Sequence, residues 1–473
     1  RNTMDPTLMA AEQLQEKWSP IIEHEDMPKI EDSYKRRVTA ILLENQEVAI
    51  NEISNAVGTG LGLATNNSNP NMQGYDPILI SLVRRAMPNL MAYDVCGVQP
   101  MTGPTGLIFA MKAKYDGQAG DEALYNEART SFGGASAGNH GGWAGTGTGN
   151  NRGGGDPLFS EGITLGAVGT GGGTVGADYG VNPAMSTSNA ENLNASSFTQ
   201  MAFSIERTAV AAKTRALKAE YTTELAQDLK AVHGLDAETE LANILSNEIL
   251  AEINREVIKT IYKGAKLGCQ QLDLYYKTAT GTTFGTDQGG IFDLRQDSDG
   301  RWSAERYRGL LYQIERECNQ VAKDTRRGKG NIVICSSDIA SAMAMGGWMQ
   351  LSGGDAGNLN VDDTGNTFVG TIGGGRIKVY VDPYATTEYI VVGYKGSNQY
   401  DAGLFYCPYV PLQMVRAVGE DTFQPKIGFK TRYGLVNNPF VGTSYSDPSS
   451  VTSNRRNQYY RIFRVDNLLG ASG

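Results

Sequence analysis

The stretch from Asp236 to Lys263 constrains the fold more than any other part of this sequence. It contains neither Gly nor Pro, and its apolar residues recur mostly three or four positions apart, which is the spacing of a helix. A helix of this length runs roughly 40 Å, about the width of a domain, so the rest of the chain must be arranged around it. The apolar positions are Leu241, Ile244, Leu245, Ile249, Ile253, Val257 and Ile261.

Both ends of the predicted helix carry the residues expected there. Asp236 stands at the N-cap position, and Glu238 and Glu240 fall in the first turn, where the helix dipole favours negative charge. Lys263 falls in the last turn, and Gly264 can adopt the left-handed conformation that ends many helices. The sequence therefore predicts one uninterrupted helix between these caps.

Four charged residues lie beside apolar faces rather than opposite them. Glu248 and Glu252 project near Leu241 on the long helix, and Arg84 and Arg85 follow an apolar segment. One interpretation is ordinary charge in contact with solvent. The alternative is that these residues form ion pairs with a neighbouring subunit in a large assembly. The sequence leaves both interpretations open.

Composition excludes several classes of protein. With 473 residues, the chain is long enough for two or three domains with a large core. It has no run of about eighteen apolar residues that could cross a membrane, and residues 1–5 lack the apolar region of a signal peptide. The net charge of −9 argues against a dedicated nucleic-acid-binding protein.

The sequence offers no constellation for catalysis or for metal binding. The cysteines are odd in number and form no CxxC pair, which predicts buried thiols in a reducing compartment. There is no GxSxG, HExxH, Walker or EF-hand motif, so we expect no enzyme, no cofactor and no metal site. The cysteines are Cys96, Cys269, Cys318, Cys335 and Cys407, and the three widely separated histidines are His24, His140 and His233.

Residues 1–52 differ in composition from the rest of the chain, with 11 acidic and 6 basic residues. Helices are predicted over Ala10–Trp18 and Tyr34–Ile53, and Gly58–Gly74 has the composition of a linker. A short amphipathic pair of helices buries little surface by itself. It must therefore pack on another part of the protein, remain loose or be removed.

A glycine-rich segment interrupts the chain. Between Gly117 and Gly180 lie 21 of the 58 glycines, and few residues there can build a core. We expect a loop-like insertion with little regular structure, ordered only against neighbours. The segment lacks a GxxxxGK[ST] motif, so phosphate binding is not expected.

The remaining patterns predict a mixture of helices and strands. Strands are expected over Tyr93–Val98 and around Met201–Ile205, a helix over Lys213–Val232, and mixed α/β structure beyond Gly264. Because strands from both ends of the chain surround the long helix, we expect domains that are not contiguous in sequence.

Five segments together resemble the major capsid proteins of T-even-like tailed bacteriophages, a family with the HK97-type capsid fold. The resemblance covers nearly the whole chain except Gly117 to about Ser196, where the glycine-rich stretch looks like a divergent replacement. The segments are LVRRAMPNLMAYDVCGVQPMTGPTG (Leu82–Gly106), LKAEYTTELAQDLKAVHGLDAETEL (Leu217–Leu241), EILAEINREV (Glu248–Val257), VGYKGSNQYDAGLFYCPYV (Val392–Val410) and FQPKIGFKTRYGLVNNPF (Phe423–Phe440).

This resemblance implies an α+β fold and a role as a shell protein. Hexamers would self-assemble in the host cytoplasm into the icosahedral or prolate head of the virion, which encloses double-stranded DNA without sequence-specific contacts and without a membrane. The implied parts are a pro-segment (1–52), an N-arm (53–96), an extended loop with the glycine-rich insertion (97–203), a peripheral domain on the long helix (204–264), an axial domain (265–408) and returning strands of the peripheral domain (409–473).

The resemblance also implies processing and partners. The family's precursor loses its N-terminal segment to a maturation protease that favours Ile/Leu-x-Glu, which points to cleavage after Glu52, with Glu44 as the alternative. We place Arg84, Arg85, Glu248 and Glu252 in assembly contacts. Other implied partners are a vertex protein, a portal, a scaffold and decoration proteins. The same weak motif also ends at Glu16, Glu23 and, within the long helix, Glu252.

Three other functions remain as alternatives. The first is the related vertex protein, which forms pentamers. The second is a nanocompartment shell of the same fold, whose chains are much shorter and lack a pro-segment. The third is an enzyme, which the missing catalytic site disfavours.

Overall fold

A computed structural model shows two compact units, one of Arg1–Ile108 with Thr208–Gly473 (unit 1) and one of Phe109–Arg207 (unit 2). Most of the glycine-rich segment, and Arg85, lie outside the described residues. The domain boundaries expected from the sequence stay a prediction. The structure describes residues 6–24, 29–58, 83–84, 90–115, 117–120, 122–124, 128, 187, 191, 200–269, 290–295, 298, 302–347, 349–351, 367–439 and 457–468.

The long helix α7 spans Ala237–Gly264, within one residue of its predicted bounds. Asp236 caps the helix by accepting a hydrogen bond from a backbone N–H of the first turn. The predicted C-cap is wrong, because Gly264 still belongs to the helix and the extended Ala265 is the C-cap. A left-handed residue is not needed there, since the chain continues directly into strand β5 (Ala265–Leu267).

The buried face of α7 is turned slightly from the predicted stripe. Ile244 was expected in the core, but its side chain is 61% exposed. Two polar residues occupy the buried face instead, and one of them, Asn254, accepts a hydrogen bond from the backbone N of Met91 at 3.1 Å. The buried residues of the main face are Ala242, Ser246, Ile249, Leu250, Ile253, Asn254, Val257, Ile258 and Ile261.

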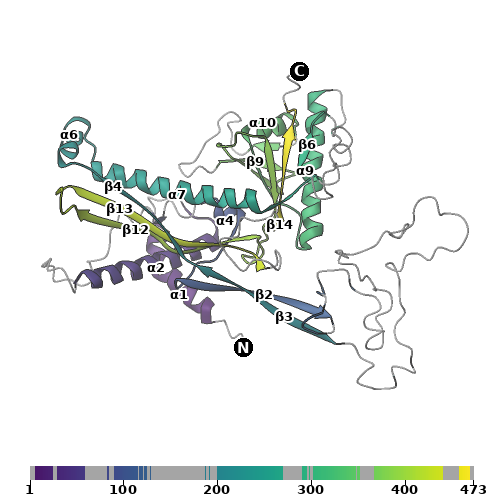
Figure 1. Cartoon of the computed structure of the whole chain (residues 1–473), viewed down its shortest axis with the longest axis horizontal. Helices are drawn as coiled ribbons and strands as arrows, with labels where there is room; N and C mark the ends of the chain where they lie inside the picture. The colour runs from purple at the N-terminus through teal and green to yellow at the C-terminus, as the bar shows by residue number, and fades with distance from the viewer. Residues whose placement is uncertain are drawn as a thin grey trace, which may run out of the picture. The chain divides into compact units, whose positions relative to one another are not determined.

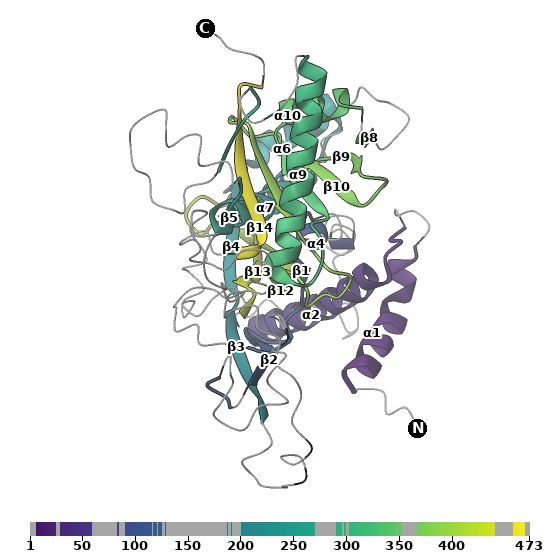
Figure 2. The same ribbon diagram turned by 90° about the vertical axis from the view of Figure 1, so that its right-hand side faces the viewer.

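A four-stranded sheet lies between α7 and helix α2 in unit 1. Its strand order is β1-β12-β13-β4, with β1 parallel to β12 and the other neighbours antiparallel. In both views α7 lies on one side of β12 and β13, and α2 lies on the other (Figures 1 and 2). The bounds are α2 (Ser33–Gly58), β1 (Gly97–Val98), β4 (Lys213–Glu220), β12 (Leu404–Val418) and β13 (Pro425–Asn437).

The prediction of one helix over Lys213–Val232 is wrong for its first part. All eight residues of β4 pair antiparallel with β13, from Lys213 opposite Tyr433 to Glu220 opposite Lys426. The helix propensity of this Ala- and Lys-rich run is weak compared with the pairing that β13 offers. Only the second part is helical, as α6 (Thr223–His233).

The first two helices belong to the main core of unit 1. Trp18 and Ile22 of α1 (Pro6–Ile22) and Leu42 and Leu43 of α2 are at most 4% exposed. They share one cluster with residues of α7, β12 and β13. Of the three possibilities for residues 1–52, the structure shows packing against the rest of the chain.

A short helix occupies part of a segment that was predicted as a strand. Residues Ala92–Val95 form α4, and only Gly97–Val98 continue as β1. The alternation of apolar residues over Tyr93–Val98 therefore misled the prediction. In a helical turn, Ala92, Tyr93 and Val95 are all buried against the main core.

A second, eight-stranded sheet carries helices α9 and α10. Helix α9 packs along β14 (Figure 2) and also contacts β11. The strand order is β5-β14-β11-β7-β10-β9-β8, with β6 beside β14. The sheet contains both parallel and antiparallel pairs, and the fold is α+β, as predicted. The bounds are β6 (Ile291–Asp293), α9 (Ser303–Thr325), β7 (Ile332–Cys335), α10 (Ser337–Met345), β8 (Met349–Leu351), β9 (Thr367–Ile372), β10 (Ile377–Val381), β11 (Tyr389–Gly393) and β14 (Asn457–Asp466).

The Asp382 carboxylate joins α7 to this second sheet. It is 2% exposed and accepts hydrogen bonds from Arg255 at 2.6 Å and from the hydroxyls of Tyr262 and Tyr389 at 2.8 and 2.6 Å. Burial alone would raise the pKa of Asp382, but the two tyrosines, the backbone N of Tyr384 and the charge of Arg255 together lower it. The group therefore stays ionised at neutral pH and fixes the C-terminal half of α7.

Three buried charges lie between α9 and β14, and a fourth, partly exposed charge on β5 makes the cluster neutral. Arg461 is 2% exposed and binds Glu317 at 3.3 Å and Asp324 at 2.7 Å. Lys266 adds a second positive charge at 3.3 Å from Asp324. Glu317 also accepts hydrogen bonds at 2.9 Å from Gln313 and from the backbone N of Cys269.

All five cysteines are buried and unbridged, which confirms the prediction of buried thiols. Burial raises the pKa of Cys96, Cys318 and Cys407 to about 12. Each of these thiols is therefore protonated and unreactive at neutral pH.

Among the helices in the described ranges, none combines the length and the apolar character that a bilayer crossing requires.

Candidate assembly surfaces

The outer part of a two-stranded ribbon carries an exposed apolar face. The ribbon consists of β2 (Thr105–Tyr115) and β3 (Met201–Ala211). Alternate residues of the part in unit 2 point to one face, and their exposed fractions run from 55% to 70%. A ribbon of two strands is only marginally stable unless its apolar face is covered. The residues of this face, called the ribbon face below, are Phe109, Met111, Met201, Phe203 and Ile205.

The opposite side of the same ribbon is less exposed and carries both apolar and polar residues. There Lys112 and Glu206 form an ion pair at 2.9 Å between the two strands. The strand predicted around Met201–Ile205 from this alternation is confirmed as β3. Its large apolar side chains lie on the more exposed side, the reverse of a strand packed on a core.

Glu248 and Glu252, both predicted on an assembly surface, have different surroundings. Glu248 is exposed on α7. Glu252 binds Arg215 of β4 at 3.0 Å, and Arg215 also binds Glu256 at 2.6 Å. Burial alone would lower the pKa of Arg215, but its bonds to Glu256 and Tyr433 raise it. Glu252 thus has a partner within its own chain.

Arg84 lies inside unit 1. It is 1% exposed and donates hydrogen bonds from Nε and Nη2 to the carbonyl oxygen of Ile22, at 3.2 and 2.7 Å. Burial and the nearby charge of Arg36 lower the pKa of Arg84. Its role in a contact between subunits stays a prediction, as does that of Arg85, which lies outside the described residues.

Both predicted cleavage positions lie within helix α2. Glu44 accepts hydrogen bonds from Lys17 at 2.8 Å and from the indole of Trp18 at 3.0 Å. Burial alone would raise the pKa of Glu44, but these two bonds lower it. Glu52 lies in the last part of α2, where the structure does not describe side chains. Cleavage at either position requires local unwinding, because a helical peptide bond is protected.

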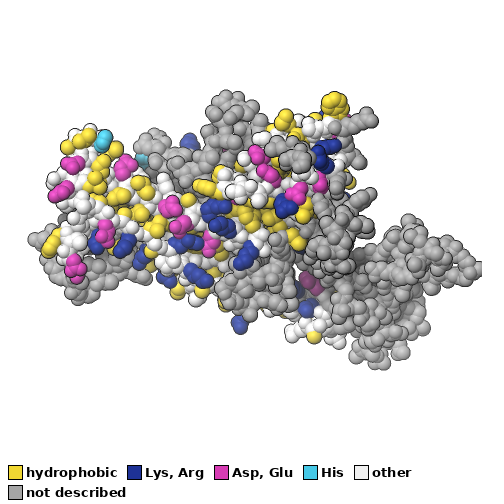
Figure 3. Space-filling model, turned by 45° about the horizontal axis from the view of Figure 1, so that its top comes forward, with side chains coloured by type: hydrophobic (Ala, Val, Ile, Leu, Met, Phe, Trp, Pro, Cys, Tyr) yellow, Lys and Arg dark blue, Asp and Glu magenta, His cyan; other side chains and the backbone are white. Residues whose placement is uncertain are grey.

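The α6 end of unit 1 exposes apolar side chains that the sequence did not indicate. Hydrophobic side chains gather at that end in Figure 3. Val232 of α6 is 74% exposed, and Phe423, in the turn between β12 and β13, is 80% exposed with a φ of 52°. A positive φ is uncommon for an aromatic residue, so the turn holds Phe423 outward at some cost. The exposed apolar residues of α6, of the end of β12 and of this turn are Leu225, Val232, Val418 and Phe423.

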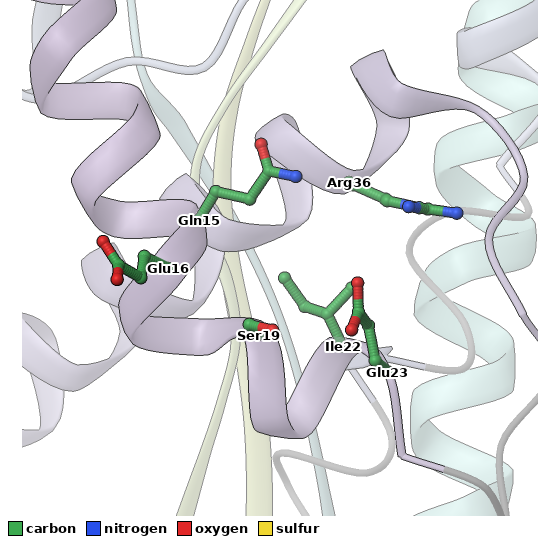
Figure 4. A pocket seen from close by; sticks show the side chains of 6 residues that line it. All are labelled: Gln15, Glu16, Ser19, Ile22, Glu23 and Arg36. Carbon is green, nitrogen blue, oxygen red and sulfur yellow. The ribbon is translucent and has the colours of Figure 1, made fainter.

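A hollow of about 340 Å³ lies between α1 and the start of α2 (Figure 4). Its lining includes two carboxylates, one guanidinium and the hydroxyl of Ser19. No group of three His, Cys, Asp or Glu side chains suited to a metal ion occurs in the part of the chain that the structure describes. Its lining residues are Gln15, Glu16, Ser19, Ile22, Glu23 and Arg36.

Known proteins resemble this chain over almost its full length. The family described as major capsid protein Gp23 matches residues 72–465. The major capsid protein of Vibrio phage KVP40 is 37% identical, and the match covers 96% of this chain and 100% of that protein. The major capsid protein of Enterobacteria phage T4 is 33% identical, with 98% of this chain and 100% of that protein covered.

Two further matches are weaker. The capsid vertex protein of Enterobacteria phage T4 is 28% identical and covers 50% of this chain and 53% of that protein. Among solved structures, the capsid of Myoviridae phage XM1 is 9% identical with a TM-score of 0.37 and covers 80% of this chain and 92% of that chain. The strongest similarity is therefore to proteins that match from end to end.

Proposed function

This chain belongs to the major capsid protein Gp23 family, and we therefore propose that it assembles as hexamers into the head of a tailed phage. The head would be icosahedral or prolate and would enclose double-stranded DNA. The match to major capsid proteins over 96% of the chain carries the proposal. A structural role also fits the exposed apolar surfaces of the described residues.

The ribbon face is the surface that we assign to contacts between copies. Its five large apolar side chains would be shielded from water by a second copy, at about 25 cal/mol for each Å² of apolar surface buried. A subunit that meets several neighbours needs only modest affinity at each contact, because the contacts add in a closed shell. The vertex protein, portal, scaffold, maturation protease and decoration proteins are proposed as further partners.

The half-length match to a capsid vertex protein keeps one alternative open. A vertex protein forms the five-fold corners of a shell, whereas the proposed function places this chain in six-fold capsomers. The lower identity of 28% over 50% of the chain favours the hexameric role. Symmetry in the assembled particle decides between the two roles.

Purified heads test both the symmetry and the processing. Electron cryomicroscopy is expected to show this chain in six-fold capsomers, and intact mass is expected to fall below the 50.9 kDa of the full chain. The unassembled chain, measured alongside, should keep the full mass. Density for this chain only at five-fold corners would move it to the vertex role, and full-length chains in mature heads would refute removal of residues 1–52.

Glu248 gives the clearest test among the predicted interface charges. Glu248→Lys is expected to lower the yield of assembled particles severalfold and to leave the melting temperature of the unassembled chain unchanged, because this side chain is exposed. Glu252→Lys serves as the contrast: it removes a partner of Arg215 and should lower the melting temperature. Normal assembly by the Glu248→Lys chain would exclude Glu248 from the contacts.

A further inference from the structure

Strand β12 leaves the regular ladder with β13 at two places. Pro408 pairs with Tyr433, Val410 with Arg432 and Gln413 with Lys430, so β12 has one extra residue on each side of Val410. Two bulges in six residues are unusual, since each leaves backbone groups without a ladder partner. The buried carbonyl groups of this stretch therefore need hydrogen-bond donors from elsewhere.

Helix α2 supplies donors to the bulged stretch. The side-chain amide of Asn45 donates to the carbonyl oxygens of Tyr409 and Met101, at 3.0 and 2.9 Å, which uses both of its protons. The amide of Gln46 donates to the carbonyl oxygen of Leu412 at 3.3 Å. Two consecutive residues of one helix thus cap one carbonyl at each bulge.

The two bulges together preserve the faces of the strand. The inner part of β12, before the bulges, pairs Leu404 with Asn437. The outer part of β12, after the bulges, pairs Val415 with Gly428. The second pairing is displaced by two residues relative to the first. A shift by one residue would turn every side chain to the other face, but a shift by two leaves each on its own face. Removal of both bulges would therefore pair Val415 with Lys426 and keep the apolar pattern.

We infer that α2 acts as a splint that holds β12 in this twice-bulged register. When the splint is lost, the outer half of β12 slides by two residues along β13, about 7 Å at the ordinary strand rise. The link to maturation depends on the proposed function, because cleavage after Glu52 would remove Asn45 and Gln46 with the rest of residues 1–52. The splint itself depends only on the contacts within the chain.

Pairs of cysteines report the register directly. Val415→Cys with Gly428→Cys should form a disulfide in the observed register, because residues directly opposite are close enough. Val415→Cys with Lys426→Cys should form one only after the slide, since diagonal neighbours lie about 7–8 Å apart. A side chain at Gly428 would meet no atom closer than 3.7 Å, and the five native cysteines are buried.

The experiment uses the full unprocessed chain with either cysteine pair. Asn45→Asp, which keeps the shape and removes the donors, is expected to raise the yield of the 415–426 disulfide at least tenfold and to lower that of the 415–428 disulfide. Gln46→Met, which also removes a donor, should act in the same direction. Glu47→Gln is the control, because Glu47 binds Lys17 of α1 rather than β12.

Three results would overturn the inference. They are an unchanged disulfide pattern in the Asn45→Asp and Gln46→Met chains, an equal change in the Glu47→Gln chain, and faster amide hydrogen exchange throughout β7 and β11, which would indicate general unfolding. The test needs neither protease nor assembled heads. An unchanged register together with normal processing in heads would refute the splint and leave the proposed function standing. A changed register in a chain that forms no processed heads would support the splint and count against the proposed function.

Discussion

A chain with Phe203→Asp and Ile205→Asp is expected to fold normally and to lose at least nine-tenths of its assembled particles. Both side chains are exposed on the ribbon face, at 60% and 62%, so their replacement should leave the unassembled chain unchanged. Covering two carboxylates with an apolar partner surface costs several kcal/mol unless they are paired. Sedimentation of assembly reactions gives the particle yield, and circular dichroism gives the melting temperature.

Leu124→Asp is the matched control for the ribbon face. Leu124 belongs to the same unit, is 86% exposed and lies outside the ribbon face. Its φ of 68° suits Asp better than Leu, so the change should not harm folding. Normal particle yield from the double variant, or an equal loss from Leu124→Asp, would exclude the ribbon face as a contact between copies.

Arg461→Met is expected to lower the free energy of unfolding by about 3–5 kcal/mol, because it leaves the buried carboxylates of Glu317 and Asp324 without their main partner. Burial alone would raise the pKa of Asp324, but Arg461 and Lys266 lower it in the native chain. Urea unfolding of the unassembled chain measures the loss.

Two further variants separate charge from packing at this cluster. Arg464→Met, on the same strand, removes a half-exposed partner of Asp466 and should cost at most about 1 kcal/mol. Adding Glu317→Gln and Asp324→Asn to Arg461→Met removes the two unpaired carboxylates and should recover much of the stability, because the one charge left, on Lys266, is partly exposed. Equal losses from Arg461→Met and Arg464→Met would contradict the importance of the buried charges.

Local patterns predicted the helical parts of the fold well. The bounds of α7 follow from a long run without Gly or Pro and from Asp236 at its start. Helix α2 was likewise predicted over Tyr34–Ile53, inside its observed bounds of Ser33–Gly58. β4 was missed because its Ala, Lys and Glu residues favour a helix in isolation, and only the distant strand β13 makes it a strand.

The assembly surfaces were harder to predict than the elements that carry them. Alternation identified the strand around Phe203, but it could not tell whether its apolar side is covered by the chain itself. The partners of Arg84 and Glu252 lie at Ile22 and Arg215, which are distant in sequence. A single sequence shows which residues are charged or apolar, and the fold decides which of them reach the surface.

The contacts by which α2 holds β12 could not be predicted from the sequence either. Asn45 and Gln46 look like ordinary polar residues of an amphipathic helix, and nothing local marks them as donors to β12. The bulges near Val410 are equally hidden, because they appear only in the register with β13. Pro408 and Pro411 were the available signals, since proline is confined to strand edges and bulges.

The contacts of Asp382 hold the C-terminal part of α7 against the second sheet. Three of the groups that meet there, Arg255, Tyr262 and Tyr389, fix one end of a helix of 28 residues, about 42 Å long. A tilt of about 5° over this length would carry the far tip through roughly 4 Å. The angle of α7 is held jointly by its buried face, by the Arg215 pairs with Glu252 and Glu256 and by Asp382, so the loss of any of these contacts would displace the α6 end of the helix.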